Sequence, residues 1–478
     1  MGDVEVSVLK VPIAKSSTIL QCVIVSCASL LSINGGLNFG WPSPSVLQLL
    51  SEESEFDITN EQVSYVVMLS PIAVCIGSPI SGALMNKVGR KNSLLILAII
   101  QLSSWVCIAA SSYVPLLFVG RILAGISDGA IVTSVPVYIC EILQPELRGY
   151  IGSIPTFGIC LGSLFMNIYG SFTSIRMSAC VSITFPVLFI ALFATIPESP
   201  YYLLMNNREK DARSALMKLR NTKEIESELF QISLDIRRQI SEPGRIKDVF
   251  TIKSNLKAFL ILLCVRVVQH LSGLTALNFY THFIFQSVDD SFSAETSAII
   301  CSVIKIVAVA IGTMLLERSG RRCLLLWSCI GSGVSLTLLG LYFSFQENLH
   351  HFPFITCLPI VMMLTYFVVN SMGLLTVPNL MMGELLSVKV KALVLSFVNI
   401  CGGIVAGVSS KSFQLLHHNF GIHMPFYVFA GFSFGGFIMI YFCVPETRGK
   451  TLEEIQQLLK NKRKASFKEP TVSCITTL

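Results

Sequence analysis

Three ionisable residues lie inside long apolar segments, where a charge can bind a solute or hold helices together. They are Asp128, Arg266 and Lys305. Placing a charge at the centre of a membrane costs about 2.5–3.5 kcal/mol, so such residues indicate a functional role. Asp128 lies 13 residues before Glu141 and Lys305 lies 12 residues before Glu317. At helical rise these separations are roughly 18–20 Å. Both residues are therefore expected near the membrane midplane.

Two arrangements fit Asp128 and Lys305. In the first they pair across a central cavity, directly or through water, and so couple two halves of the chain or bind a charged group of a solute. In the second each faces cavity water of its own, because buried charges require partners but not these particular ones.

The composition requires that these residues be carried by membrane helices. Of 478 residues, 53% are apolar and only 13% are charged, and the mean hydropathy is +0.68, whereas soluble chains carry about 25% charged residues. Apolar runs of about 20 residues recur and are apolar on every face, which favours helices over barrel strands. The sequence predicts an all-α polytopic membrane protein with twelve transmembrane helices.

The predicted spans fall into two sets of six, separated by a polar segment with helical patterning. The expected organisation is an N-terminal tail (1–17), a six-helix half (18–195), a linker (196–255), a second six-helix half (256–444) and a C-terminal tail (445–478). Lys and Arg gather in the loops on the side of the linker and tails, so the positive-inside rule predicts cytoplasmic termini. The net charge of +6 therefore reflects topology, and no nucleic-acid partner is expected.

Short motifs recur between the halves. Gly89-Arg90-Lys91 matches Gly320-Arg321-Arg322, Glu141 matches Glu384, and Pro197-Glu198-Ser199 matches Pro445-Glu446-Thr447, at offsets of 231, 243 and 248 residues. Three ordered matches indicate a duplicated six-helix unit, an organisation typical of alternating-access transporters that bind solute near the midplane.

These motifs, with Gly120-Arg121, Gln269-His270-Leu271-Ser272-Gly273 and the Pro445–Thr451 stretch, resemble the sugar porters of the major facilitator superfamily. The resemblance covers essentially the whole chain and is strongest to the insect facilitated trehalose or glucose transporter type. It implies the two-half fold of that superfamily, a small sugar as solute and a membrane location, expected to be the plasma membrane.

The resemblance also implies a gating role for charged residues at the cytoplasmic ends of the spans, where an Arg pairs with a Glu of a neighbouring helix when the inner side is closed. The alternative is that these charges only fix topology. The gating residues so assigned are Arg90, Glu141, Arg148, Glu317, Arg321 and Glu384.

Family sugar sites use amides, which offer donors and acceptors to hydroxyls, and an aromatic plane. Gln269 and Asn278 match the family pattern. At five other positions this chain has a different residue. Where the family has a second Gln it has His270, where the family has Asn it has Thr275 and Lys305, in place of the pocket Trp it has Asn379, and in place of a fifth-span Gln it has Thr156. All seven residues are assigned to solute binding. His270 is either a pH-sensitive group or a neutral hydrogen-bonding residue.

Proton-coupled relatives carry an acidic residue directly after the motif that reads Phe39-Gly40-Trp41 in this chain. This chain has Pro42 at that position, which favours facilitated uniport. The sequence contains no nucleotide-binding loop or catalytic constellation, so neither an enzyme nor a cofactor is expected. Two alternatives remain: a carrier of another polar or charged solute, which a proton gradient could drive, and a transport-poor sugar receptor. The sequence does not indicate an oligomeric state.

Overall fold

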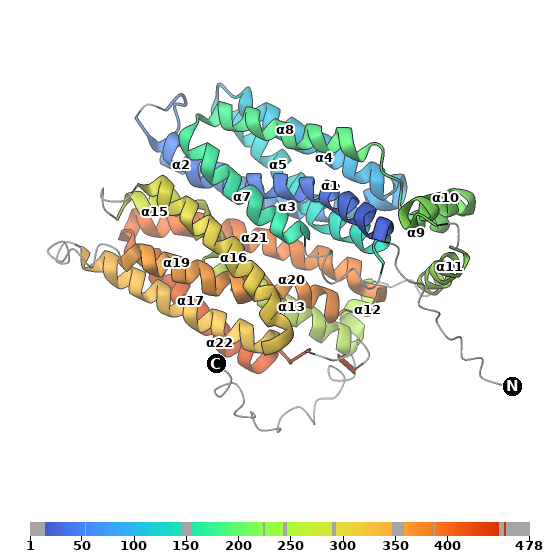
Figure 1. Cartoon of the computed structure of the whole chain (residues 1–478). Coiled ribbons are helices and arrows are strands. Elements are labelled where there is room, and N and C mark those ends of the chain that lie inside the picture. The colour runs from blue at the N-terminus through green and yellow to red at the C-terminus, as the bar shows by residue number, and fades with distance from the viewer. Residues whose placement is uncertain are drawn as a thin grey trace.

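The computed structural model describes residues 15–52, 54–144, 154–222, 225–241, 246–288, 293–346, 358–386, 388–448 and 454–455. Its secondary structure in these ranges is helical, without strands. Figure 1 shows two groups of roughly parallel helices, the N-terminal group in blue to green and the C-terminal group in yellow to red.

The N-terminal half contains six long helices, the first of which bends at Trp41 and Pro42. Pro42 occupies the first turn of α2, where proline needs no hydrogen-bonded N–H, so the chain continues with little interruption. The elements are α1 (Lys15–Gly40), α2 (Pro42–Leu50), α3 (Asn60–Val88), α4 (Arg90–Ala109), α5 (Val114–Ile142), α7 (Ile154–Phe172) and α8 (Ile175–Phe193).

The C-terminal half repeats this plan, but two of its spans are broken. The first break follows α13 at Gly273, whose φ of 91° suits a residue without Cβ. The second is a π-helical turn, η2, before α20. The elements are α13 (Lys253–Leu271), α14 (Leu274–Phe279), α15 (Thr281–Gln286), α16 (Ala294–Ser319), α17 (Arg321–Ser344), α19 (Leu358–Asn370), η2 (Ser371–Leu375), α20 (Val377–Glu384), α21 (Val388–Phe420) and α22 (His423–Cys443).

Within the described ranges, eleven helical segments are long and apolar enough to cross a membrane. The twelfth span is α7, 19 residues long, which packs against α1 and α8 like the other spans. Its buried face carries glycines, Ser163 and Asn167. The glycines allow a close approach to α1: a Cβ on Gly162 would lie 1.9 Å from the carbonyl oxygen of Ile33. The predicted twelve-helix fold is confirmed.

Between the halves, the chain forms α9 (Pro200–Met205), α10 (Glu209–Arg220), α11 (Glu226–Ser241) and α12 (Ile246–Thr251). These helices gather at one end of the bundle, called here the linker end (Figure 1). Arg220 ties α10 to the first half by donating to the carbonyl oxygen of Ile142 at 2.9 Å, and it pairs with Glu228. The opposite end, near residues 51–59, is called the far end.

The two halves meet along α3 and α21, and α7 and α16. At the far end this seam is closed, because Lys411 donates to the Ser64 hydroxyl at 2.5 Å and Gln414 donates to the carbonyl oxygen of Asn60. Near the middle, the Cys75 thiol donates to the carbonyl oxygen of Ile400 at 3.2 Å.

Toward the linker end the same face of α3 loses its cover. Pro79, Ala83 and Asn86 are exposed, and a Cβ on Gly82 would meet nothing within 4 Å. The bundle is therefore closed between its halves at the far end, and the α3 face is open toward the linker end.

Candidate functional site

The seven residues assigned to solute binding do not form one contact cluster; six of them fall into three groups in the second half. In the first group, Arg266 of α13 donates to the side-chain oxygens of Gln269 at 2.7 Å, Asn379 at 3.3 Å and Asn399 at 3.3 Å. Its Nε has no partner in the described part of the chain. The predicted intramembrane cation is thus held by amide oxygens.

The second group stands at the break after α13. A ring nitrogen of His270 lies 2.9 Å from the Thr275 hydroxyl, and the His270 carbonyl oxygen accepts a hydrogen bond from Ser409. The His270 side chain therefore has a neutral hydroxyl as its hydrogen-bonding partner.

The third group joins Lys305 of α16 to Asn278 of α14. The Lys305 ammonium donates to the Asn278 side-chain oxygen at 2.5 Å and lies 5.5 Å from the centre of the Phe367 ring. These residues line a small cavity of about 10 Å³, room for about one water. Asn167 of α7 also lines it and donates to Ser302 of α16 at 2.7 Å. The cavity therefore lies between the two halves.

Thr156, the seventh predicted binding residue, lies half-buried in the first turn of α7. This helix contacts α16 across the seam, so Thr156 stands on the element that faces the Lys305 group. Among the described residues, no hydrogen bond joins its side chain to another predicted binding residue.

Asp128 belongs to a polar network inside the first half. One of its carboxylate oxygens accepts hydrogen bonds from Asn38 and Gln101, both at 3.3 Å. Asn34 donates to Gln101 and accepts from Trp105, both at 2.7 Å. Asp128 and Lys305 are not paired with each other, because each has its hydrogen-bond partners in its own half.

Arg121 is a fourth intramembrane charge. From the sequence it was identified only as part of the Gly120-Arg121 motif. It is fully buried, its guanidinium lies 4.8 Å from the centre of the Trp41 ring, and it interacts electrostatically with Asp128. The amides of Asn34, Asn38 and Gln101 were missed too, although polar residues within apolar helices are themselves a sequence signal.

The repeated Gly-Arg motif begins α4 in the first half and α17 in the second. The Glu198 carboxylate accepts hydrogen bonds from the backbone N–H groups of Arg90 at 3.0 Å and Lys91 at 2.9 Å. Glu446 accepts equivalent bonds from Arg321 and Arg322, both at 3.0 Å. A carboxylate at a helix N-terminus satisfies free N–H groups and the helix dipole. Both halves thus repeat the same cap.

The side chain of Arg90 also pairs with Glu141 of α5, at 2.9 Å, and Glu141 accepts a hydrogen bond from Ser199. This pair lies within the first half and does not bridge the two halves. Of the other predicted gating residues, Arg321 contributes its backbone to the Glu446 cap. Arg148 and the side chains of Glu317 and Glu384 lie outside the described residues.

Replacing Gly89 by alanine is expected to destabilise the protein by about 1–3 kcal/mol, since φ and ψ of 97° and 169° lie in a region that only glycine favours. The added Cβ would also lie 2.3 Å from a Glu198 oxygen. Gly82→Ala on α3 is the matched control, because its Cβ would meet open space and alanine favours helix. Thermal unfolding of both purified variants checks this: equal melting temperatures would contradict it.

The far end carries contacts that the sequence analysis did not identify. Both ring nitrogens of His282 in α15 are within hydrogen-bonding distance of first-half serines, Ser43 at 2.7 Å and Ser171 at 2.8 Å. The Lys411 ammonium lies 4.3 Å from the centre of the Tyr65 ring. These contacts hold the halves together on the side away from the linker.

Comparison with known proteins places this arrangement in a family. The family model described as "Sugar (and other) transporter" matches residues 11–459. The facilitated trehalose transporter Tret1 of Culex quinquefasciatus is 33% identical over 451 residues, covering 93% of this chain and 87% of that protein. Tret1 of Drosophila grimshawi is also 33% identical, but the chain spans only 48% of its length.

Solved structures agree on the fold. The inward open conformation of the xylose transporter XylE from E. coli has a TM-score of 0.76 and 22% identity, covering 91% of this chain and 99% of that one. The XylE proton:xylose symporter bound to 6-bromo-6-deoxy-D-glucose has a TM-score of 0.73 and 21% identity, with the same coverage. The chain is a multi-pass membrane protein that belongs to the sugar (and other) transporter family.

Proposed function

We propose that this protein carries a small sugar, of the trehalose or hexose class, down its gradient by alternating access. The observation that carries the proposal is the placement of amide, hydroxyl and ammonium groups at the junction of two helical halves that are closed at one end. The match to trehalose transporters supports this solute class.

The chemistry of the three groups suits a polyhydroxylated solute. Amides of Gln269, Asn278 and Asn379 offer both donors and acceptors, and Arg266 and Lys305 add donors that sugar hydroxyls can accept. Each of these five side chains now forms a hydrogen bond with another of them. A sugar would exchange these internal bonds for bonds to its hydroxyls, so binding is linked to rearrangement at the seam.

The proposed cycle moves one half against the other about this junction. We take the linker end as cytoplasmic, because the charge distribution in the loops predicts it. We take the plasma membrane as the location, since a sugar carrier acts there at the cell surface. In this assignment the structure is closed toward the outside. The far-end contacts of His282, Lys411 and Gln414 would then break when the carrier opens outward.

Purified protein in proteoliposomes is expected to show saturable entry of labelled glucose or trehalose that does not respond to an imposed pH gradient. The reason is Pro42, which stands where proton-coupled relatives carry an acid. Counterflow gives a second readout, because a carrier exchanges labelled for unlabelled sugar whereas a receptor only binds it. Accumulation driven by the gradient would refute uniport, and binding without counterflow would refute transport. Protein-free liposomes are the control.

A further inference from the structure

The interior of the second half carries positive charge without negative charge. Arg266 of α13 and Lys305 of α16 lie inside the bundle: Lys305 is only 6% exposed, and Arg266 is half-buried. In the first half, by contrast, the buried Arg121 has Asp128 as an electrostatic partner. The second half has acidic residues only at the ends of its spans or outside them. None occurs in residues 254–288, 296–316, 321–346, 348–383 or 388–445.

Both cations are held by uncharged oxygen atoms. Arg266 donates to Gln269 at 2.7 Å and to Asn379 and Asn399, both at 3.3 Å, and Lys305 likewise donates to an amide oxygen. In the part of the chain that the structure describes, neither forms an ion pair with an acid. Charges inside a membrane protein are normally paired, because leaving them unpaired is costly. An anionic solute would supply the partner that these spans lack.

The two cations belong to one polar network. A Cβ on Gly402 of α21 would lie 3.4 Å from Nε of Arg266 and 3.5 Å from Nε2 of His270, so these two side chains meet the same point of α21. His270 bonds to Thr275 of α14. The amide that Lys305 contacts is three residues further along α14, which places it on the same helix face. A solute bound beside this face lies in the field of both cations.

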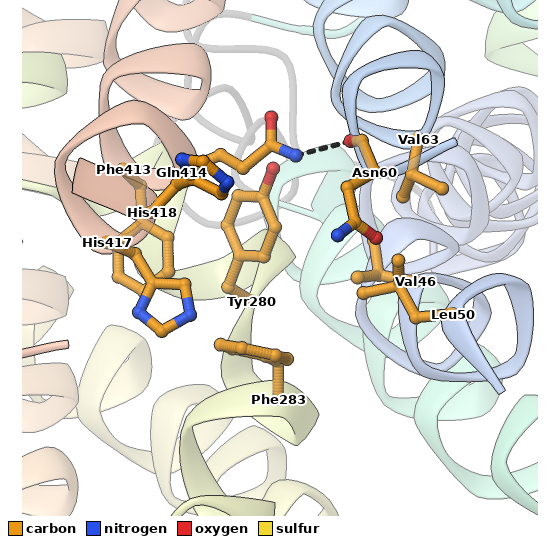
Figure 2. Close-up of a pocket in the computed structure, with 10 residues that line it drawn as sticks. All are labelled: Val46, Leu50, Asn60, Val63, Tyr280, Phe283, Phe413, Gln414, His417 and His418. Atoms are coloured by element: carbon orange, nitrogen blue, oxygen red, sulfur yellow. Dashed lines mark hydrogen bonds between the residues drawn. The ribbon is translucent and has the colours of Figure 1, made fainter. Parts of the chain in front are cut away.

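Arg266 is the more accessible of the two cations. It is half-buried and its partner Asn379 is exposed, whereas Lys305 adjoins a cavity of about 10 Å³, room for about one water. The far end is closed, and Figure 2 shows the Gln414 side chain meeting Asn60 across the seam there. A solute therefore reaches Arg266 from the linker end, toward which the α3 face is open.

We propose that Arg266 binds the carboxylate of an anionic sugar, so that the carrier prefers a hexuronate to an uncharged sugar of the same shape. A guanidinium matches a carboxylate through two parallel N–H···O bonds. The carboxylate replaces the amide oxygens of Asn379 and Asn399, whose bonds to Arg266 are the longer ones. The freed amides then offer donors and acceptors to the ring hydroxyls. This inference rests on the proposed sugar transport and narrows its solute class.

The test is calorimetric titration of the full-length protein in nanodiscs with D-glucuronate and D-glucuronamide, which differ in charge but hardly in shape. Wild-type protein is expected to bind glucuronate at least about tenfold more tightly, as hydrogen bonds between charged groups imply. Arg266→Gln keeps an amide donor but loses the charge, and is expected to reduce this ratio to less than about threefold. Arg266→Lys restores the charge without the planar fork, so its ratio is expected to lie between the two.

Arg208→Gln is the matched control, because it removes the same charge from an exposed position in the linker and is expected to leave the ratio unchanged. Equal affinity of the wild-type protein for the two probes would overturn the proposal without any variant. A preference for glucuronate that survives Arg266→Gln would overturn it as well.

Flux measurements separate this inference from the transport on which it rests. Entry of labelled glucose into proteoliposomes, together with equal binding of glucuronate and glucuronamide, would refute the anionic solute and leave the carrier role standing. Preferred binding of glucuronate that depends on Arg266, without entry of glucose or glucuronate, would support the site and refute transport alone.

Discussion

Replacing Gly403 by leucine is expected to lower sugar uptake at least about fivefold and to leave the far end open for longer. A Cβ on Gly403 would lie 2.6 Å from the carbonyl oxygen of Pro71, a backbone atom of α3 in the other half. Leucine adds three further carbons, so α3 and α21 cannot close to their present separation. Overpacking of this kind costs about 1–3 kcal/mol, which corresponds to roughly a 5- to 150-fold shift between states.

The matched control for Gly403→Leu is Gly431→Leu on α22, an exposed position where a Cβ would meet nothing within 4 Å. Both variants make the same chemical change in a membrane helix, but only Gly403 lies at the seam. Initial uptake rates in proteoliposomes give the first readout.

Access to the seam gives the second readout for this pair of variants. Ser64→Cys, which is buried against Lys411, is expected to react faster with a membrane-impermeant maleimide when Gly403→Leu is also present. Equal uptake by the two glycine variants, together with unchanged labelling, would show that closure of α3 on α21 is not part of the transport cycle.

Much of the fold followed from local features of the sequence. Long apolar segments and the repeated Gly-Arg motif are readable without tertiary information, since each depends on a few adjacent residues. Both halves indeed place Glu198 and Glu446 on equivalent helix starts. The breaks at Gly273 and η2 are less evident, because each lies inside a long segment that is apolar on average.

The partners of the site residues could not be predicted in the same way. Spacing along a helix placed Asp128 and Lys305 at similar depth, but it does not fix which way each side chain faces or which amide is nearest. In the structure, Asp128 accepts hydrogen bonds from Asn38 and Gln101, and Lys305 donates one to Asn278. The far-end contacts of Lys411 and Gln414 depend on both halves meeting, which no local pattern encodes.

Removing the charges of Asp128 and Lys305 is expected to reduce the kcat/KM of sugar uptake roughly 10- to 100-fold for each change, and the two losses are expected to multiply. Hydrogen bonds to charged groups contribute about 1.5–3 kcal/mol, and each removal leaves a buried amide unsatisfied. Residues with no shared partner give additive free energies within about 0.5 kcal/mol. Since the two charges have separate partners in separate halves, their effects should not couple.

A double-mutant cycle with Asp128→Ala and Lys305→Met measures this, using kcat/KM from counterflow. Lys253→Met, at the exposed start of α13, controls for the loss of a lysine. Lys305→Gln is expected to retain more activity than Lys305→Met, because the glutamine amide, one bond shorter than the lysine ammonium, keeps a donor near Asn278 and the sugar hydroxyls. A double variant no worse than either single one would contradict the predicted independence of the two charges. It would mean instead that Asp128 and Lys305 act as one pair at another stage of the cycle, brought together when the halves move.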